Sequence, residues 1–234
     1  LNSDTIVLDG AIDKTFEFAE KKTDAAVIGC RILNRDRSLQ PSCFMFPSLL
    51  NMLLFSTYLY KFLPKNRFFG REKMTWWNRK DIREVDTVTG CFMLVRKVAI
   101  EKIGVLDENY FVYGEETDWC YRFKKAGWKN IFFPDAEIIH LGGASTKMNA
   151  GPMTLQLRGS ILYFIKKHNS KAAYILSCIL TELFFIIRII PWLLMSAINS
   201  KNRPACWSRV TVYAMGIVKT LKGYRGLIQQ HKLF

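Results

Sequence analysis

The stretch Tyr110 to Ser145, YFVYGEETDWCYRFKKAGWKNIFFPDAEIIHLGGAS, carries most of the signals that decide the fold. Its pattern predicts a helix over 118–126, which Gly127 ends because glycine readily adopts the left-handed backbone of a helix C-cap. Short strands are predicted over 128–133 and 137–140, on either side of Pro134-Asp135. Strands that alternate with short helices indicate an α/β layered domain.

The residues before this stretch continue the alternation. An amphipathic helix is predicted over 11–22, with Ile12, Phe16 and Ala19 along one side. The sequence also predicts a buried strand over 25–33 and an apolar helix over 47–60 that is too short to cross a bilayer. An apolar strand interrupted by Gly90 is expected over 85–95, followed by a short helix over 97–103 that Gly104 ends.

Composition and charge divide the chain into two parts. The 234 residues are 50% hydrophobic and 14% aromatic, which excludes a disordered protein and allows one core with an appendage. Residues 151–234 contain twelve of the Lys and Arg residues but one acid, Glu182, so this tail carries +11 of the net charge of +14. A basic, apolar tail suits an anionic membrane surface, where each Lys or Arg adds about 1 kcal/mol of attraction.

Nucleic acid is the other partner that a basic protein could bind. The sequence has no zinc-finger spacing, no RNP-like aromatic motif and no helix-turn-helix pattern. The six cysteines form no Cys-x-x-Cys pair, which favours reduced, buried thiols in a cytosolic compartment. We therefore expect no nucleic-acid partner.

The segment 172–198 is the candidate membrane segment of the tail. As a helix it would be roughly 40 Å long, enough to cross a bilayer. Its charged residues Glu182 and Arg188 oppose insertion, and Pro191 introduces a kink. Positive charges flank the segment on both sides, which fits a helix lying on the membrane slightly better than a span. A helix packed on a soluble domain is the third alternative.

Three acids near the start of the helix at 118–126 are candidates for proton transfer. Glu115, Glu116 and Asp118 lie within four positions, where acids are also expected from the helix dipole alone. Mutual repulsion and apolar neighbours should raise at least one pKa, as a general base near neutral pH requires. Asp118 and Arg122 are four residues apart and are expected to form an ion pair, so Glu115 or Glu116 is the better candidate.

Two further residues have the chemistry of metal ligands. His140 ends a predicted strand just before Gly142 and Gly143, where an imidazole is well placed to bind a metal. Asp4 lies in an Asn-Ser-Asp turn near the start of the chain. A structural histidine and an ordinary Asx-turn explain the two residues equally well.

Taken together, these segments resemble family-two inverting glycosyltransferases with the GT-A fold, especially their rhamnosyltransferase-like bacterial branch. The resemblance covers residues 1 to about 150 in order. Five stretches carry it: LNSDT at 1–5, similar to LNPDT; Gln40-Pro41-Ser42 with Phe46-Pro47, similar to Q-x-S…FP; TGCFMLVR at 89–96, similar to G-A-x-M-L-I-R; 104–122, similar to G-x-F-D-E-x-F-F-x-Y-x-E-D-x-D-x-x-x-R; and 127–145, similar to G-W…P-x-A-x-V-x-H-x-x-G-x-S.

The resemblance assigns a binding role to residues of both ends of this region. It implies that Asp4 and His140 help to hold Mg²⁺ or Mn²⁺ on the diphosphate of a nucleotide-sugar donor. Asn2 stands where the first acid of a DxD motif would be, a substitution usual in this branch. Gly90 and Cys91 would lie beside the bound sugar and acceptor, where small residues leave room.

The resemblance also assigns the base. Glu116 takes the place of the aspartate in the family's Glu-Asp pair, and Glu115 is the second candidate. The longer side chain of Glu116 is a departure from the family pattern. Asp118 and Arg122 fall within the matched motif and are counted among the substrate-binding residues.

The implied protein transfers a sugar, with inversion, to a glycan or lipid-linked acceptor in cell-surface polysaccharide synthesis at the cytoplasmic face of the bacterial inner membrane. Residues 1–150 would be the C-terminal part of a GT-A domain and 151–234 a membrane-associating helical tail. No nucleoside-binding βαβ segment precedes Leu1, so we expect an N-terminally truncated chain that is inactive alone. The alternative is a non-catalytic membrane-associated protein on a decayed transferase fold.

Overall fold

The computed structural model describes residues 1–142, 150–198 and 202–228, which form two compact units. The first unit comprises Leu1–Phe46, Pro64–Glu108 and 115–142. The second comprises Pro47–Leu63, Asn109–Gly114 and the described residues from 150 onward. The predicted tail therefore lies in the second unit, together with two segments from earlier in the chain. The domain boundary predicted at residue 150 stays a prediction.

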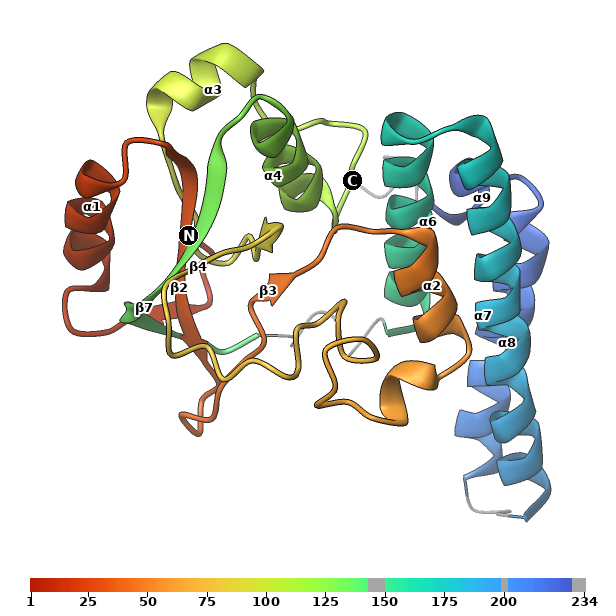
Figure 1. The fold of residues 1–234 in the computed structure, drawn as a ribbon. Coiled ribbons are helices and arrows are strands. Elements are labelled where there is room, and N and C mark those ends of the chain that lie inside the picture. The colour runs from red at the N-terminus through yellow and green to blue at the C-terminus, as the bar shows by residue number, and fades with distance from the viewer. Residues whose placement is uncertain (143–149, 199–201, 229–234) are drawn as a thin grey trace. The chain divides into compact units, whose positions relative to one another are not determined.

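A mixed sheet forms the centre of the first unit (Figure 1). Its order is β1-β7-β2-β6, and β4 also pairs with β7. The strands β2 and β7 run parallel, and the other pairs are antiparallel. The strand bounds are β1 (Thr5–Val7), β2 (Ala25–Leu33), β4 (Arg83–Glu84), β6 (Leu94–Val95) and β7 (Lys129–His140), with β3 (Cys43–Phe44) and β5 (Thr87–Val88) in a separate two-stranded sheet.

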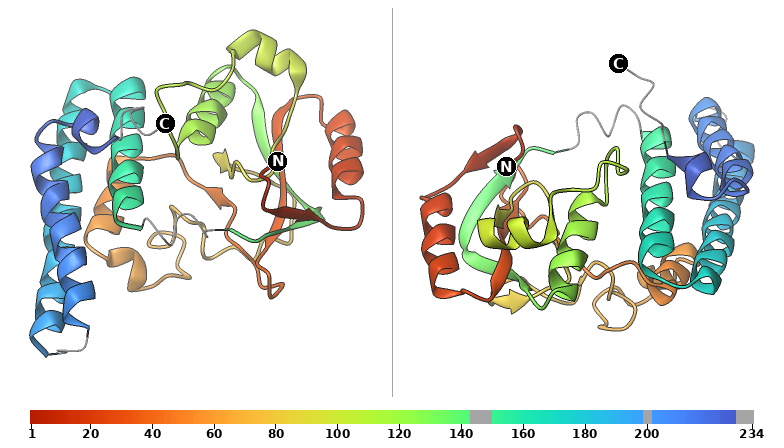
Figure 2. Two further views of the ribbon diagram at one scale, coloured as in Figure 1. Left: turned by 180° about the vertical axis from the view of Figure 1, so that it is seen from behind. Right: turned by 90° about the horizontal axis from the view of Figure 1, so that it is seen from above.

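Helices cover both faces of this sheet, as α/β layering predicts (Figures 1 and 2). They are α1 (Ala11–Lys21), α3 (Lys97–Ile103) and α4 (Glu115–Lys125). Alternate residues of β7 face opposite layers: Ile131 and Phe133 join the core with α1, whereas Phe132 joins the core with α4. Phe132 is fully buried, which contributes about 1.5–3 kcal/mol to the stability of the fold. The predicted α/β class is confirmed.

Several predicted elements occur with the predicted bounds. The buried strand over 25–33 is β2 and the short helix over 97–103 is α3. Gly104 and Gly127 follow α3 and α4 with φ angles of 86° and 88°, the left-handed conformation expected at a C-cap. Helix α4 begins three residues earlier than predicted, so that Glu115 and Glu116 lie in its first turn.

The predicted side of α1 was wrong for Ile12 and Phe16 and right for Ala19. Ile12 and Phe16 are 46% and 56% exposed, whereas Ala11, Thr15 and Ala19 are buried. These three residues follow one another at four-residue intervals on a single face of the helix. Their small side chains let α1 lie close to β2 and β7, and Phe18 at the border of this face stacks on Phe133 of β7.

Three strand and helix predictions need correction. The two strands predicted over 128–133 and 137–140 are one strand, β7. Residues 134–136 interrupt its pairing with β2, between the pairs Cys30–Phe133 and Arg31–Glu137, without ending the strand. The segment 85–95 contains two short strands, β5 and β6, rather than one. The helix predicted over 47–60 is divided into α2 (Leu49–Ser56) and the 3₁₀ turn η1 (Leu59–Lys61), because Tyr58 has a φ of 61° that no α-helix accommodates.

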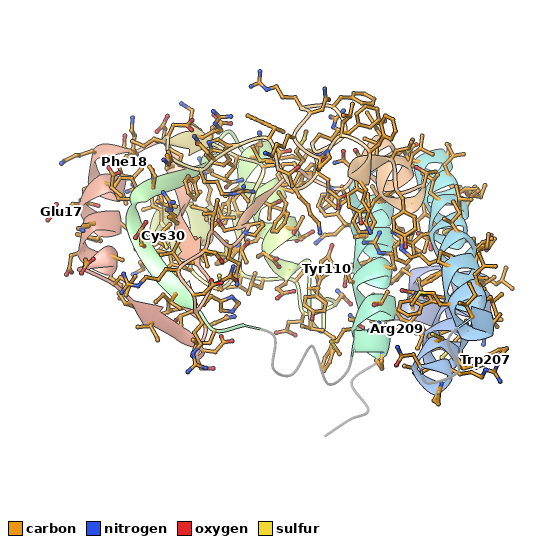
Figure 3. All side chains as sticks on the ribbon, turned by 90° about the horizontal axis from the view of Figure 1, so that it is seen from below. Glu17, Phe18, Cys30, Tyr110, Trp207 and Arg209 are labelled. Carbon is orange, nitrogen blue, oxygen red and sulfur yellow. The ribbon has the colours of Figure 1, made fainter. Side chains whose placement is uncertain are left out.

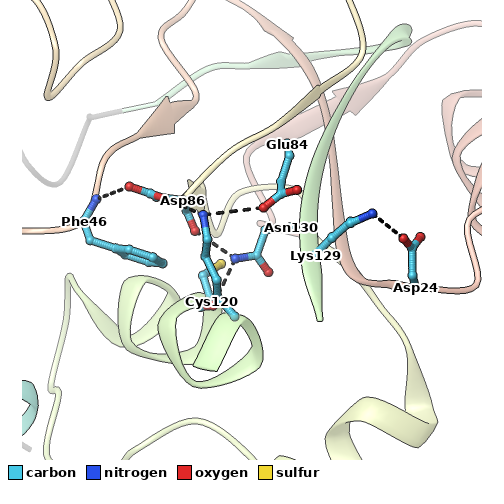
Figure 4. A network of polar contacts seen from close by, with 8 residues as sticks. Asp24, Phe46, Glu84, Asp86, Cys120, Lys129 and Asn130 are labelled. Carbon is cyan, nitrogen blue, oxygen red and sulfur yellow. Dashed lines mark hydrogen bonds and ion pairs between the residues drawn. The ribbon is translucent and has the colours of Figure 1, made fainter. Parts of the chain in front are cut away.

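A polar network fixes α4 against the sheet (Figure 4). Asn130 of β7 is fully buried and donates hydrogen bonds to the carbonyl oxygens of Asp86 and Cys120. The Lys124 ammonium lies 2.9 Å from the Asp86 carboxylate and 3.5 Å from that of Glu84. Asp86 also accepts a hydrogen bond from the backbone N–H of Phe46. The orientation of α4, and hence of its first turn, is fixed by these contacts.

The second unit is helical. It contains α2, η1, α6 (Ala150–His168), α7 (Lys171–Ile198), α8 (Arg203–Thr220) and α9 (Tyr224–Leu227). Helices α7 and α8 pack closely, because a Cβ atom on Gly216 of α8 would clash with the ring of Phe185 of α7. The predicted helical tail is confirmed.

Arg188 of α7 is buried within this second unit. Its guanidinium donates hydrogen bonds to the carbonyl oxygens of Phe55 and Ser56 at the end of α2, and to that of Phe184. It also lies 3.6 Å from the centre of the Phe184 ring. The side chain therefore caps α2 and does not point outward from α7.

Candidate active site

Asp4 and His140 are brought together by strand pairing. Asp4 directly precedes β1, and His140 is the last residue of β7. The antiparallel register pairs Thr5 with His140, and the backbone N–H of Leu141 donates to the carbonyl oxygen of Asp4. As a result the Asp4 Oδ1 and His140 Nε2 atoms lie 3.3 Å apart. The Asp4 side chain is 45% exposed and that of His140 is 17% exposed, so the pair is open to solvent on one side.

The other ring nitrogen of His140 has a partner that orients the imidazole. His140 Nδ1 lies 2.7 Å from Oε1 of Gln40. Histidine ligands of metals commonly engage their second nitrogen in this way, which fixes the ring and its tautomer. Gln40 lies in one of the five stretches that carry the family resemblance, but the resemblance assigned it no role.

A divalent cation fits this donor set. A carboxylate oxygen and an imidazole nitrogen suit Mn²⁺ or Mg²⁺, and Mg²⁺ is commonly bound through one or two protein carboxylates together with substrate phosphates and water. Among the described residues no group of three or more His, Cys, Asp or Glu side chains could hold a metal ion. Asp4 and His140 would supply two donors at this place, and phosphate and water oxygens would add to them.

Cys91 connects this pair to the acids of α4. The backbone N–H of Asn2 donates to the carbonyl oxygen of Cys91 at 3.0 Å. Burial, followed by the negative charges of Asp4 and Glu116, raises the pKa of the Cys91 thiol to about 11. Both carboxylates are thus within electrostatic reach of one buried thiol, one on the side of β1 and the other at the start of α4.

Gly90 makes room for Glu116. A Cβ atom on Gly90 would lie 3.7 Å from Cβ and 3.8 Å from Cγ of Glu116. A larger side chain at this position would fill the space beside the Glu116 stem. Asn2, Gly90, Cys91 and Glu116 therefore form one neighbourhood, and their individual roles remain predictions.

Glu115 lies in a different environment from that of an exposed helix-capping acid. Burial raises its pKa above the ordinary value for a glutamate. Its Oε2 atom is buried without a hydrogen-bond partner. The expectation that at least one of the clustered acids has a raised pKa is met at this residue.

Comparisons with known proteins show the family of the chain. The model of the family described as glycosyltransferase like family 2 matches residues 1–160 of the chain. The chain belongs to this family. Its curated relatives include an N-acetylglucosaminyl-diphospho-decaprenol L-rhamnosyltransferase of Mycobacterium tuberculosis, 29% identical over 68% of the chain and 52% of the relative. Rhamnosyltransferase WbbL of Escherichia coli is 38% identical over 24% of the chain and 21% of its own length.

The matches are partial for the longer proteins. The chain spans about half the length of the mycobacterial rhamnosyltransferase that it matches. A galactofuranosyl glycosyltransferase of Leishmania donovani is 23% identical over 70% of the chain and 40% of its own length. The predicted membership of a rhamnosyltransferase-like branch of glycosyltransferase family 2 is thus confirmed.

Two of the predicted substrate-binding residues of this family-2 chain contact each other. Arg122 Nε lies 2.8 Å from Oδ2 of Asp118, whose side chain is fully buried. Arg122 also donates to the carbonyl oxygens of Ile103 and Val105, beyond the end of α3. The pair therefore ties α4 to α3, as expected from its spacing. A direct contact of either residue with substrate stays a prediction, and the burial of Asp118 does not favour it.

Two residues of the last matched motif, Gly143 and Ser145, fall outside the described residues.

A cavity of about 350 Å³ lies between α1 and β6, away from the predicted site. It is lined by residues such as Phe16, Leu94 and Val98, and by none of the predicted site residues. That cavity therefore does not contribute to the candidate active site.

Proposed function

We propose that this protein is an inverting, metal-dependent glycosyltransferase that moves a sugar from a nucleotide-diphosphate sugar to an acceptor hydroxyl. Family membership supports sugar transfer in glycan biosynthesis. The observation that carries the proposal is the contact of 3.3 Å between Asp4 and His140. The buried thiol of Cys91 lies within electrostatic reach of both Asp4 and Glu116. A cation-binding pair and a carboxylate near one small, buried residue are the two parts that such a transfer needs.

The acid at position 116 is the proposed base. Glu116 would take the proton of the acceptor hydroxyl, whose oxygen forms a bond to the anomeric carbon as the bond to the diphosphate breaks. The attack comes from the face opposite the leaving group, so one displacement inverts the configuration. Glu115, with its raised pKa, is the second candidate for this step.

Asp4 and His140 are the proposed residues that hold the cation and, through it, the donor diphosphate. A bound Mg²⁺ or Mn²⁺ would neutralise the negative charge that develops on the departing diphosphate. Asn2, whose backbone joins the two parts of the site, would lie beside the donor. Gly90 and Cys91 would leave space for the transferred sugar.

We propose a lipid-linked or glycan acceptor and a role in cell-surface polysaccharide synthesis. The mycobacterial relative is named for transfer to a lipid diphosphate that carries N-acetylglucosamine. An acceptor of this kind lies at a membrane surface, which agrees with the basic tail and with a place at the cytoplasmic face of the bacterial inner membrane.

A panel of nucleotide sugars tests the proposed activity. Incubation of the full-length protein with Mn²⁺ and each sugar nucleotide should release a nucleoside diphosphate from one donor far faster than from the others. Removal of the metal with EDTA should stop that release. If no sugar nucleotide is consumed under any condition, with or without lipid acceptors, the proposed function is wrong.

The helical unit has an apolar surface that suits membrane contact. By length and composition α7 is, within the described residues, the one helix able to cross a bilayer. One stripe along α7 is exposed: Ile175, Ile179, Ile186, Ile190, Leu194 and Ile198 are each 47–85% accessible. Trp207 of α8 is 50% exposed and projects outward (Figure 3). Arg188 faces inward, so its charge is removed from this surface, whereas Glu182 of α7 is partly exposed.

We propose that this stripe lies on an anionic membrane surface. An interfacial helix buries one apolar face, whereas a spanning helix needs an apolar surface all round. Arg203 of α8 is exposed and Arg209 and Lys219 are partly exposed, and each would contribute about 1 kcal/mol through anionic lipids.

Vesicle sedimentation tests this second proposal. The protein should sediment with vesicles that contain phosphatidylglycerol, and Ile179→Glu with Ile190→Glu should release it. Val98→Glu, a change at a 59% exposed apolar residue of the first unit, is the matched control and should bind as before. Extraction at alkaline pH should release an interfacial protein. Full recovery of the unchanged protein in the soluble fraction at low salt would contradict the proposal.

A further inference from the structure

A run of polar side chains behind His140 connects it to the turn that follows β2. Within this turn, Ser38 Oγ lies 2.6 Å from Oδ1 of Asp36, and Asn34 Nδ2 lies 2.9 Å from Ser38 Oγ. Gln40 Nε2 then lies 2.9 Å from Oδ1 of Asn34. The last member is His140, whose Nδ1 atom lies 2.7 Å from Oε1 of Gln40. Four hydrogen bonds thus join Asp36 to His140 across the first unit.

The first member of the run determines its direction. The Asp36 carboxylate accepts hydrogen bonds from the hydroxyl and the backbone N–H of Ser38, which lower its pKa. An ionised carboxylate can only accept, so the Ser38 hydroxyl must be the donor in this contact. The Ser38 oxygen can then only accept from its next neighbour, Asn34.

The direction of this first hydrogen bond determines which group donates in each of the others. Asn34 must offer its NH₂ group to Ser38, so its oxygen faces Gln40. Gln40 must offer its NH₂ group to Asn34, so its oxygen faces His140. An amide oxygen only accepts, and the proton of the contact must therefore be on Nδ1 of His140. In the neutral imidazole this leaves Nε2 with a free lone pair.

The free lone pair points at a second acceptor. His140 Nε2 lies 3.3 Å from the carboxylate oxygen Oδ1 of Asp4. Two lone pairs that face each other at this distance are favourable only when a positive charge lies with them. A structural role for the turn at 34–38 would hold the chain in place, but it would require no particular tautomer.

We propose that Gln40 is a positioning residue, and that the hydrogen bonds from Asp36 through Gln40 hold His140 with its proton on Nδ1, so that Nε2 is available to a divalent cation beside Asp4. The part that concerns the cation rests on the proposed function. The part that concerns the tautomer rests on the hydrogen bonds alone.

Nitrogen NMR of the imidazoles tests the tautomer directly. In protein labelled with ¹⁵N at histidine, at a pH where the rings are neutral, two-bond couplings distinguish a protonated Nδ1 from a protonated Nε2. We expect His140 to be protonated at Nδ1 without any metal present. His168, in the helical unit, gives an internal reference in the same spectrum.

Three variants separate positioning from folding. Gln40→Leu should lose the Nδ1 proton preference and weaken Mn²⁺ binding by about 10–100-fold, as removal of a residue behind a metal ligand commonly does. Gln40→Glu keeps an acceptor toward Nδ1 and should restore the tautomer. Ser38→Ala should shift the tautomer in the same direction as Gln40→Leu, but less. Far-UV circular dichroism and the His168 signals should stay unchanged in all three.

Two results would overturn the proposal: a proton on Nε2 of His140 in the unchanged protein, or a Gln40→Leu variant with the original tautomer and Mn²⁺ affinity. No shift in Ser38→Ala would overturn the part of the run that begins at Asp36. A protein with the expected tautomers that transfers no sugar from any donor would refute the proposed function and leave the positioning role of Gln40 standing.

Discussion

Glu116→Gln is expected to reduce sugar transfer by about 10²–10⁴-fold, the usual contribution of a positioned general base. The substitution keeps the size of the side chain, so its contact with Gly90 should be retained. It removes the group that accepts the proton of the acceptor hydroxyl. The rate should be measured with saturating donor and Mn²⁺, and the affinity for the nucleoside diphosphate should stay the same, because Asp4 and His140 are unchanged.

Glu115→Gln is the matched control for this experiment. Burial raises the pKa of Glu115, so its ionised form destabilises the folded protein at pH values above its unfolded pKa, and the effect disappears as the pH falls below that value. The glutamine variant should therefore unfold at a higher temperature than the original at neutral pH, while transfer continues. If Glu115→Gln is inactive and Glu116→Gln turns over normally, the assignment of the base is wrong.

The sequence allowed the elements of the first unit to be predicted better than their packing. The strand β2 was found because nine residues from Ala25 to Leu33 form one nearly continuous apolar run, which is typical of a strand covered on both faces. The buried face of α1 was found only in part, because hydrophobicity does not distinguish the exposed Ile12 and Phe16 from Phe18, which stacks on Phe133. Only the neighbouring strands determine that the small side chains of Ala11 and Thr15 turn inward.

The candidate site shows the same limit. Asp4 and His140 are separated by most of the first unit in sequence, and the resemblance rather than any spacing brought them together in the prediction. Their contact depends on the register of β1 with β7, which is a tertiary property. Gln40 was missed as a partner of His140 because a lone glutamine has no spacing signal. That burial raises the pKa of Glu115 in particular was likewise beyond reach, since adjacent helical residues point about 100° apart and meet different neighbours.

Arg188 shows how a correct observation can lead to an incomplete inference. Its charge was counted in the sequence as opposing the insertion of 172–198 into a membrane. The guanidinium instead lies against the end of α2 and donates to two carbonyl oxygens there and to that of Phe184 in α7. A charged residue within an apolar helix therefore indicates which face of the helix contacts protein. It does not by itself rule out contact between the opposite face and lipid.

Asp4→Asn and His140→Ala are expected to have the second large effect. Each should weaken Mn²⁺ binding in the presence of a nucleoside diphosphate by about 10–100-fold or more, and should reduce transfer by about 10²–10³-fold, comparable to the loss of one group that stabilises transition-state charge. The cation affinity can be measured by calorimetry or by the electron paramagnetic resonance of free Mn²⁺. Asp9→Asn is the matched control, because Asp9 is an exposed aspartate just beyond β1 with no predicted role.

The double variant makes this last prediction decisive. If Asp4 and His140 hold one cation, the loss of one donor also weakens the contact of the cation with the other, so the two losses should add incompletely. The variant Asp4→Asn with His140→Ala should then bind Mn²⁺ more tightly than the sum of the two single losses predicts. Losses that add in full would mean that the two residues act at separate places, even though their side chains lie 3.3 Å apart. In that case the pairing of β1 with β7 would be a structural feature, and the cation would have to be held elsewhere.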